Sequence, residues 1–209
     1  MRKGVRQRAS ENLKEGFWFP AFQRLINFLY TRLSLGFRFK NWLTVGDEAP
    51  RGAAELYQIL VILLGAGLLA LVSSTNPLPD WLAVTATIVA VYFTGDLLVF
   101  SLHWTFVADR KLKSYRRSLA TFLLNLAVQV PLFFTLLYSA NGCLTSAMPP
   151  WSALYSTLAS VLSIQLPTLK AEPVCAAFAH YQVFVATIVL GIIVASIVGA
   201  VIREEKSKA

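Results

Sequence analysis

Four long apolar runs limit what this chain can fold into. They cover residues Leu56–Ser74, Trp81–Trp104, Leu119–Tyr138 and Phe178–Ile202. A helix rising about 1.5 Å per residue needs roughly 20 residues to cross the ~30 Å hydrocarbon core of a bilayer, and each run is long enough. With 56% hydrophobic and only 14% charged residues among 209, the chain is too apolar for a soluble domain. We therefore predict an all-α membrane protein with four transmembrane helices.

The basic residues are divided unevenly between the two sides of these runs. Of 19 Lys and Arg, ten precede the first run, five lie in the second connection and three follow the fourth run. The connection Thr75–Asp80 has none, and the third connection has only Lys170. Because cytoplasmic loops carry an excess of Lys and Arg, we expect both termini in the cytoplasm. The net charge of +8 then reflects topology and attraction to anionic lipids, and no nucleic-acid partner is expected.

A further apolar pattern precedes the first run. Between Pro20 and Leu35, one helical face carries Phe22, Leu25, Ile26, Leu29 and Leu33. Aromatic residues flank this stretch on both sides, as is typical of a helix lying in the headgroup layer. We predict an interfacial amphipathic helix within residues 1–53. Its role stays open between anchoring alone and coupling to a pore or to a partner.

A shorter apolar stretch, Trp151–Lys170, lies between the third and fourth runs. It is too apolar for an ordinary loop and too short to cross a bilayer, which is typical of a re-entrant segment. We therefore predict a re-entrant helix on the outer side. The chain then divides into an interfacial segment (1–53), two spans with a basic connection (54–117), and a module of span, re-entrant helix, span and tail (118–209).

Polar side chains inside the predicted spans are candidate functional residues. They are Asp96, His103, Asn125 and Gln129. A carboxylate at membrane depth costs a few kcal/mol unless it is paired or hydrated, so Asp96 needs a partner. Asn125 and Gln129, one turn apart on the third span, are the expected partners. Asp96 would then hold the bundle together; the alternative is a role in gating or proton sensing.

The two cysteines, Cys143 and Cys175, flank the re-entrant segment and are both expected outside. This placement favours a disulfide, with two reduced thiols as the alternative. His103 and His180 lie at opposite ends of their spans and cannot share a haem or a metal ion. The sequence contains no nucleotide-binding glycine loop and no nucleophile–base pattern. We expect no cofactor, no metal and no enzymatic activity.

The fourth span carries small residues at every fourth position: Thr187, Gly191, Ala195 and Gly199. Such a stripe lets helix backbones approach closely, either within one chain or between copies. Gly191 lies near the middle of the span, where it is also a position at which the helix could bend.

From about Ser118 to Arg203 the order is span, short apolar helix, loop and span. The short helix reads ALYSTLASVLS over residues 153–163, and the following span begins AFAHYQVFVATIVLG over residues 177–191. This region resembles the pore module of the tetrameric pore-loop cation channels, the potassium-channel superfamily. The resemblance implies a homo-tetramer, a filter after the short helix and a hinge at Gly191.

The candidate filter is Ser163, Ile164, Gln165, Leu166, Pro167 and Thr168. The family's potassium filter reads Thr-Val-Gly-Tyr-Gly, and its glycines let the backbone aim carbonyl oxygens at the ion. Here Gln165 and Pro167 replace the glycines and Leu166 replaces the tyrosine, which argues against potassium selectivity. The leading hypothesis is a channel-like protein passing a cation or small solute. The alternatives are a non-conducting accessory or assembly subunit that binds membrane partners, and a small transporter using Asp96.

Overall fold

The computed structural model describes residues 18–43, 53–107, 115–145, 149–163 and 169–208. Within these ranges the regular elements are helices, and one isolated β-bridge pairs Leu144 with Leu169. Four helical segments are long and apolar enough to span a membrane: Glu55–Ser74, Asp80–Phe106, Ala120–Ala140 and Pro173–Ala195. The prediction of an all-α protein with four membrane-spanning helices is therefore confirmed, and the chain is a multi-pass helical protein in contact with lipid.

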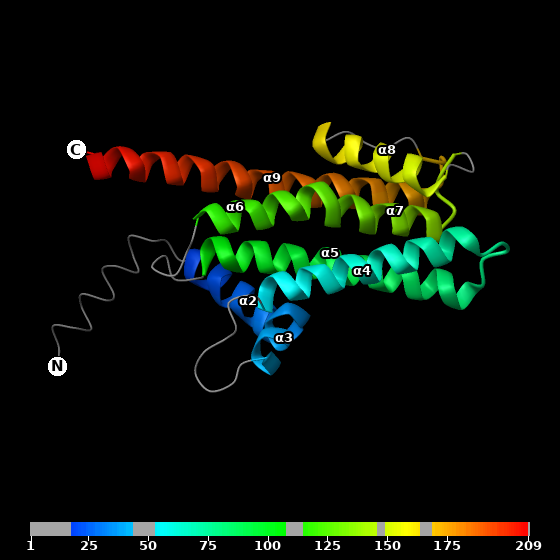
Figure 1. Cartoon of the computed structure of the whole chain (residues 1–209), viewed down its shortest axis with the longest axis horizontal. Helices are drawn as coiled ribbons and strands as arrows, with labels where there is room; N and C mark the ends of the chain where they lie inside the picture. The colour runs from blue at the N-terminus through cyan, green and yellow to red at the C-terminus, as the bar shows by residue number, and fades with distance from the viewer. Residues whose placement is uncertain (1–17, 44–52, 108–114, 146–148, 164–168, 209) are drawn as a thin grey trace.

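The spanning helices run side by side in one bundle (Figure 1). They are α4 (Ala53–Ser74), α5 (Asp80–Phe106), the segment α6–η2–α7, and α9 (Pro173–Lys208). The disulfide between Cys143 and Cys175 lies at one end of the bundle, which we call the disulfide end. Helix α9 extends beyond the other spans at the opposite end, which we call the basic end (Figure 1).

The third span forms the core of the bundle. It consists of α6 (Tyr115–Leu124), η2 (Asn125–Gln129) and α7 (Val130–Ala140). Ten of the eleven residues of α7 are buried. The Phe133 ring stacks on Phe93 of α5 with centroids 5.5 Å apart. A Cβ added at Gly65 of α4 would lie 3.0 Å from Leu132, so α4 also packs closely on this span.

A single π-helical turn, η2, interrupts the third span just before a proline. The Val130 N–H donates to the Asn125 carbonyl, five residues back. Pro131 lacks an N–H, and a proline ring crowds the carbonyl four residues before it in a regular α-helix. Widening the preceding turn relieves that crowding, and such bulges are a common source of bends in helices.

The amphipathic helix predicted over Pro20–Leu35 is present as α2 (Trp18–Leu33), with each end two residues earlier, and a second helix, α3 (Leu35–Leu43), follows it. Ser34 separates the two, because its Oγ accepts the Phe37 N–H at 3.3 Å. A serine in this position caps the start of a new helix.

Helix α2 packs across the basic end of α5. The Gln23 side chain donates to the Phe106 carbonyl at 2.8 Å, and the Tyr30 ring stacks on His103 with centroids 3.8 Å apart. Ile26 is buried in this contact, whereas Leu25 is exposed. The predicted apolar face is therefore only partly the face that packs on the bundle.

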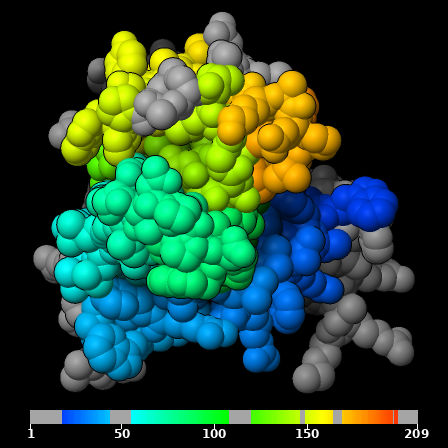
Figure 2. Space-filling view, turned by 90° about the vertical axis from the view of Figure 1, so that its right-hand side faces the viewer, coloured from blue at the N-terminus to red at the C-terminus, as the bar shows by residue number. Residues whose placement is uncertain are grey.

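The short helix α8 (Pro150–Ser163) lies beside α7 and α9 and runs back from the disulfide end toward the middle of the bundle (Figure 1). Viewed from that end, α8 and the start of α9 lie on either side of the end of α7, with α4 and α5 below them (Figure 2). A short helix is thus present where the sequence predicts the re-entrant segment.

Candidate functional site

The segment that carries α8 begins at a tight helix end. The Cys143 N–H donates to the Tyr138 carbonyl at 2.9 Å, and the Gly142 N–H donates to the Ser139 carbonyl at 3.3 Å. These two bonds form a Schellman motif, which needs a left-handed residue between helix and loop. Gly142 supplies that residue with φ of 62°. The turn directs the chain away from α7 and positions Cys143 for its partner.

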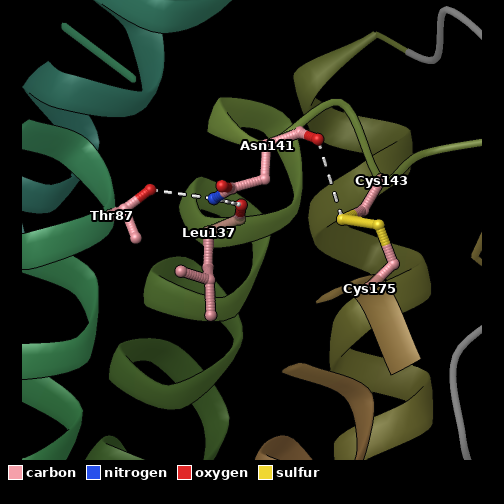
Figure 3. The surroundings of a disulfide bond; sticks show 5 residues. All are labelled: Thr87, Leu137, Asn141, Cys143 and Cys175. Carbon is pink, nitrogen blue, oxygen red and sulfur yellow. Dashed lines mark hydrogen bonds between the residues drawn. A yellow bond between two sulfur atoms is a disulfide. The ribbon is translucent and has the colours of Figure 1, made fainter. Parts of the chain in front are cut away.

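Cys143 is joined to Cys175 in the first turn of α9, as predicted, with Cα atoms 5.5 Å apart (Figure 3). The backbone of Lys170 donates to the Cys143 carbonyl at 2.9 Å, and Leu144 forms a β-bridge with Leu169. Together these contacts close a neck at the base of the α8 segment. Its entrance and its exit are therefore held at the same place.

The neck is also tied to the spans below it. The Asn141 side-chain amide donates to Thr87 Oγ1 and to the Leu137 carbonyl, each at 2.8 Å (Figure 3). The first of these bonds links the end of α7 to α5. The disulfide end is thus one connected unit comprising parts of α5, α7, α8 and α9.

A buried polar network holds α8 against the bundle. Gln182 of α9 is completely buried. Its Oε1 accepts the Tyr138 hydroxyl at 2.6 Å, and its Nε2 donates to Ser160 Oγ at 2.9 Å. One amide therefore connects α7, α8 and α9. We call these three residues the Gln182 network. The sequence signal was an amide inside an apolar run, and we did not predict it.

The C-terminal end of α8 leads into the candidate filter. Ser163 is exposed, and its hydroxyl donates back to the Ala159 carbonyl, four residues earlier in the helix, at 2.7 Å. The remaining filter candidates, Ile164–Thr168, lie outside the described residues. The Gln182 network contacts α8 at Ser160, one turn before the filter begins.

Asp96 lies in the basic half of α5 and is buried. Tyr57 of α4 donates its hydroxyl to Asp96 Oδ2 at 2.5 Å. The prediction that Asn125 would pair with Asp96 was wrong, since Asn125 accepts a bond from Gln58 at 2.9 Å. Gln129 is buried in η2. Polar pairs thus tie α4 both to α5 and to the third span.

The second carboxylate oxygen of Asp96, Oδ1, is buried and has no hydrogen-bond partner among the described residues. Helix α3 covers this region: the Phe39 ring lies 5.7 Å from the Tyr57 ring, and a Cβ added at Gly36 would lie 3.0 Å from it. Burial and, secondarily, the Asp96 charge raise the pKa of Tyr30 on α2. The amphipathic helices therefore lie next to the buried carboxylate.

The predicted stripe of small residues on α9 faces outward: its members with a described side-chain environment do not pack against the rest of the chain. Thr187, Gly191 and Ala195 are exposed, and a Cβ added at Gly191 would meet no atom within 4 Å. Gly199 lies further along the same helix. Helix α9 continues through Gly191 without a break from Pro173 to Lys208.

His180 is also exposed, at the disulfide end of α9, far from the His103–Tyr30 stack.

The exposed face of α9 has a regular repeat. His180, Phe184, Thr187, Gly191, Val194 and Val198 are all exposed and follow one another at alternating intervals of four and three residues. This interval is the heptad repeat by which helices of separate chains pack along a common seam. The exposed face of α9 thus combines apolar, small and polar side chains along one side of the helix.

The fold and these contacts define the class: a multi-pass helical membrane protein with a short helix clamped at one end of its bundle. Comparison with protein-family models, curated proteins and solved structures gives no match to this chain.

Proposed function

We propose that the chain is a subunit of a channel-like homo-oligomer, a tetramer, that passes a cation or small solute without potassium-type selectivity. The observation that carries this proposal is the Gln182 network, which holds the last turn of the short apolar helix α8 against the two spans α7 and α9. The segment that carries α8 enters and leaves at the same end of the bundle. Segments of this kind are found in membrane proteins where the backbone is buried in protein or lines a water-filled path.

The exposed seam of α9 supports assembly from several copies. In a lone chain, Thr187 and Gly191 would face hydrocarbon, where they add little to stability. Around a common axis, the same face would bring four α9 helices together, and the tetramer would contain four copies of Ser163, Gln165 and Thr168. Rings of polar groups can replace part of an ion's hydration shell, which a single copy cannot do.

The orientation follows from the charge distribution. We infer that the basic end and both termini lie in the cytoplasm, because the disulfide end carries only Lys170 among the connections on its side. A cysteine introduced in place of Glu172, which is exposed at the disulfide end, should react with a membrane-impermeant thiol reagent added to intact cells. Reaction only after the membrane is broken would reverse the orientation.

The test of function is ion flux in reconstituted liposomes. We expect Gln165→Ala to change the flux rate or its ion preference without changing the size of the oligomer. Gln23→Ala is the matched control, because it removes the same amide at the basic end, far from α8. If wild-type liposomes show no flux under any imposed ion gradient, the chain is an accessory subunit and this proposal fails.

A further inference from the structure

Helices α2 and α3 present a surface that is both cationic and apolar. Its exposed basic residues are Arg24, Arg32, Arg38 and Lys40, and its exposed large apolar residues include Trp18, Leu25, Phe28 and Trp42. No Asp or Glu occurs between residues 18 and 43. We call this set the α2–α3 surface. Its charge is complementary to an anionic partner, and its apolar area requires that partner to be amphiphilic.

The position of this surface is fixed by contacts on the opposite side of the helices. Gln23 and Ile26 face α5, and the Tyr92 hydroxyl of α5 donates to the Leu33 carbonyl at 2.5 Å. The surface therefore belongs to the folded bundle and lies beside the basic end of the spans. In a bilayer this is the level at which the phospholipid headgroups of one leaflet are found.

The corner between α2 and α3 brings the Arg38 guanidinium onto the backbone of Arg32. Arg38 Nη2 donates to the Arg32 carbonyl at 2.6 Å, which places the Arg38 side chain over the end of α2. Both arginine side chains are exposed. A guanidinium carries five N–H donors in a planar fork that matches the oxygens of a phosphate. One bond to a carbonyl leaves the fork of Arg38 able to bind such a group.

We propose that the α2–α3 surface binds an anionic phospholipid of the leaflet at the basic end, with the phosphate against Arg32 and Arg38. The acyl chains then lie along the exposed apolar residues, so one ligand satisfies both features of the surface. An acidic peptide would satisfy the charges but would leave the apolar side chains at the membrane boundary uncovered. The site does not depend on whether the bundle conducts ions.

The test uses the full-length protein in mixed phosphatidylcholine and phosphatidylglycerol, with retained lipids counted by native mass spectrometry. Wild-type protein should retain phosphatidylglycerol in preference to phosphatidylcholine, and higher salt should weaken this preference. Removing the charge of Arg32 or Arg38 should lower the preference by about fivefold for each residue, since a basic residue near an anionic surface contributes about 1 kcal/mol.

Three variants make the result specific to the corner. R32Q/R38Q should lose the preference, R32K/R38K should keep most of it, and Lys170→Gln at the disulfide end should keep all of it. Each variant must elute at the wild-type volume, which shows that the bundle is intact. Equal retention of the two lipids by the wild-type protein would overturn the proposal. So would an unchanged preference in R32Q/R38Q, or loss of preference in both arginine double variants.

Discussion

Replacing Gln182 with leucine tests whether the Gln182 network holds α8 in place. The substitution conserves approximate size but removes both hydrogen bonds, and it leaves the fully buried Tyr138 hydroxyl without its acceptor. Hydrogen bonds between membrane helices contribute about 0.6 kcal/mol on average and at most about 1.7 kcal/mol. A stranded buried hydroxyl costs about 1–3 kcal/mol. We expect Gln182→Leu to lower the free energy of unfolding by about 1–3 kcal/mol.

The assay is thermal unfolding in detergent, where this loss corresponds to a fall in Tm of roughly 2–4 °C per kcal/mol for a chain of this size. In a Tyr138→Phe background there is no hydroxyl to strand, so the same substitution should cost about 1 kcal/mol less. Gln23→Leu, which removes one solvent-exposed hydrogen bond at the basic end, should cost less than about 0.5 kcal/mol. If Gln182→Leu leaves Tm unchanged, or if its effect adds independently to that of Tyr138→Phe, the network does not hold α8.

Two further perturbations address the neck and the buried carboxylate. Reduction of the bond between Cys143 and Cys175, which are 32 residues apart, should lower the free energy of unfolding by about 3–4 kcal/mol. The reducing agent should not change the Tm of a variant with both cysteines replaced by serine. If it lowers the Tm of the wild type and of this variant equally, the disulfide does not contribute the expected stability. Asp96→Asn should elute as the wild type, because the amide oxygen still accepts the Tyr57 hydroxyl, whereas Asp96→Leu should cost about 1–3 kcal/mol. Loss of assembly in Asp96→Asn would mean that the charge itself is required.

The spans and the disulfide could be predicted from the sequence because each depends on a property of the chain alone. A run of about 20 apolar residues has no other stable environment than a bilayer or a large protein core. The starts of the spans followed from this rule, with the largest error at α9, which begins at Pro173 rather than Phe178. Proline suits the first turn of a helix, so the helix starts before the apolar run does.

The polar contacts could not be predicted, because they depend on how the helices are rotated against one another. Asp96 was identified as a residue in need of a partner, but Tyr57 looked like an ordinary aromatic residue near the end of a span. Gln182 was not singled out, because it lies in an apolar segment that resembles a pore-lining helix. The break at Ser34 depends on a single cap bond, which interrupts an otherwise continuous amphipathic pattern.

The central claim is that several copies assemble around the exposed seam of α9, and subunit counting tests it most directly. The protein, labelled once per chain, would be reconstituted at low density and its copies counted by single-molecule photobleaching. We predict four bleaching steps, and a shift to fewer steps when Gly191 is replaced by Phe, whose Cβ would lie in open space and whose ring would obstruct the seam. A single step for the wild-type protein at every protein-to-lipid ratio would contradict the proposed assembly.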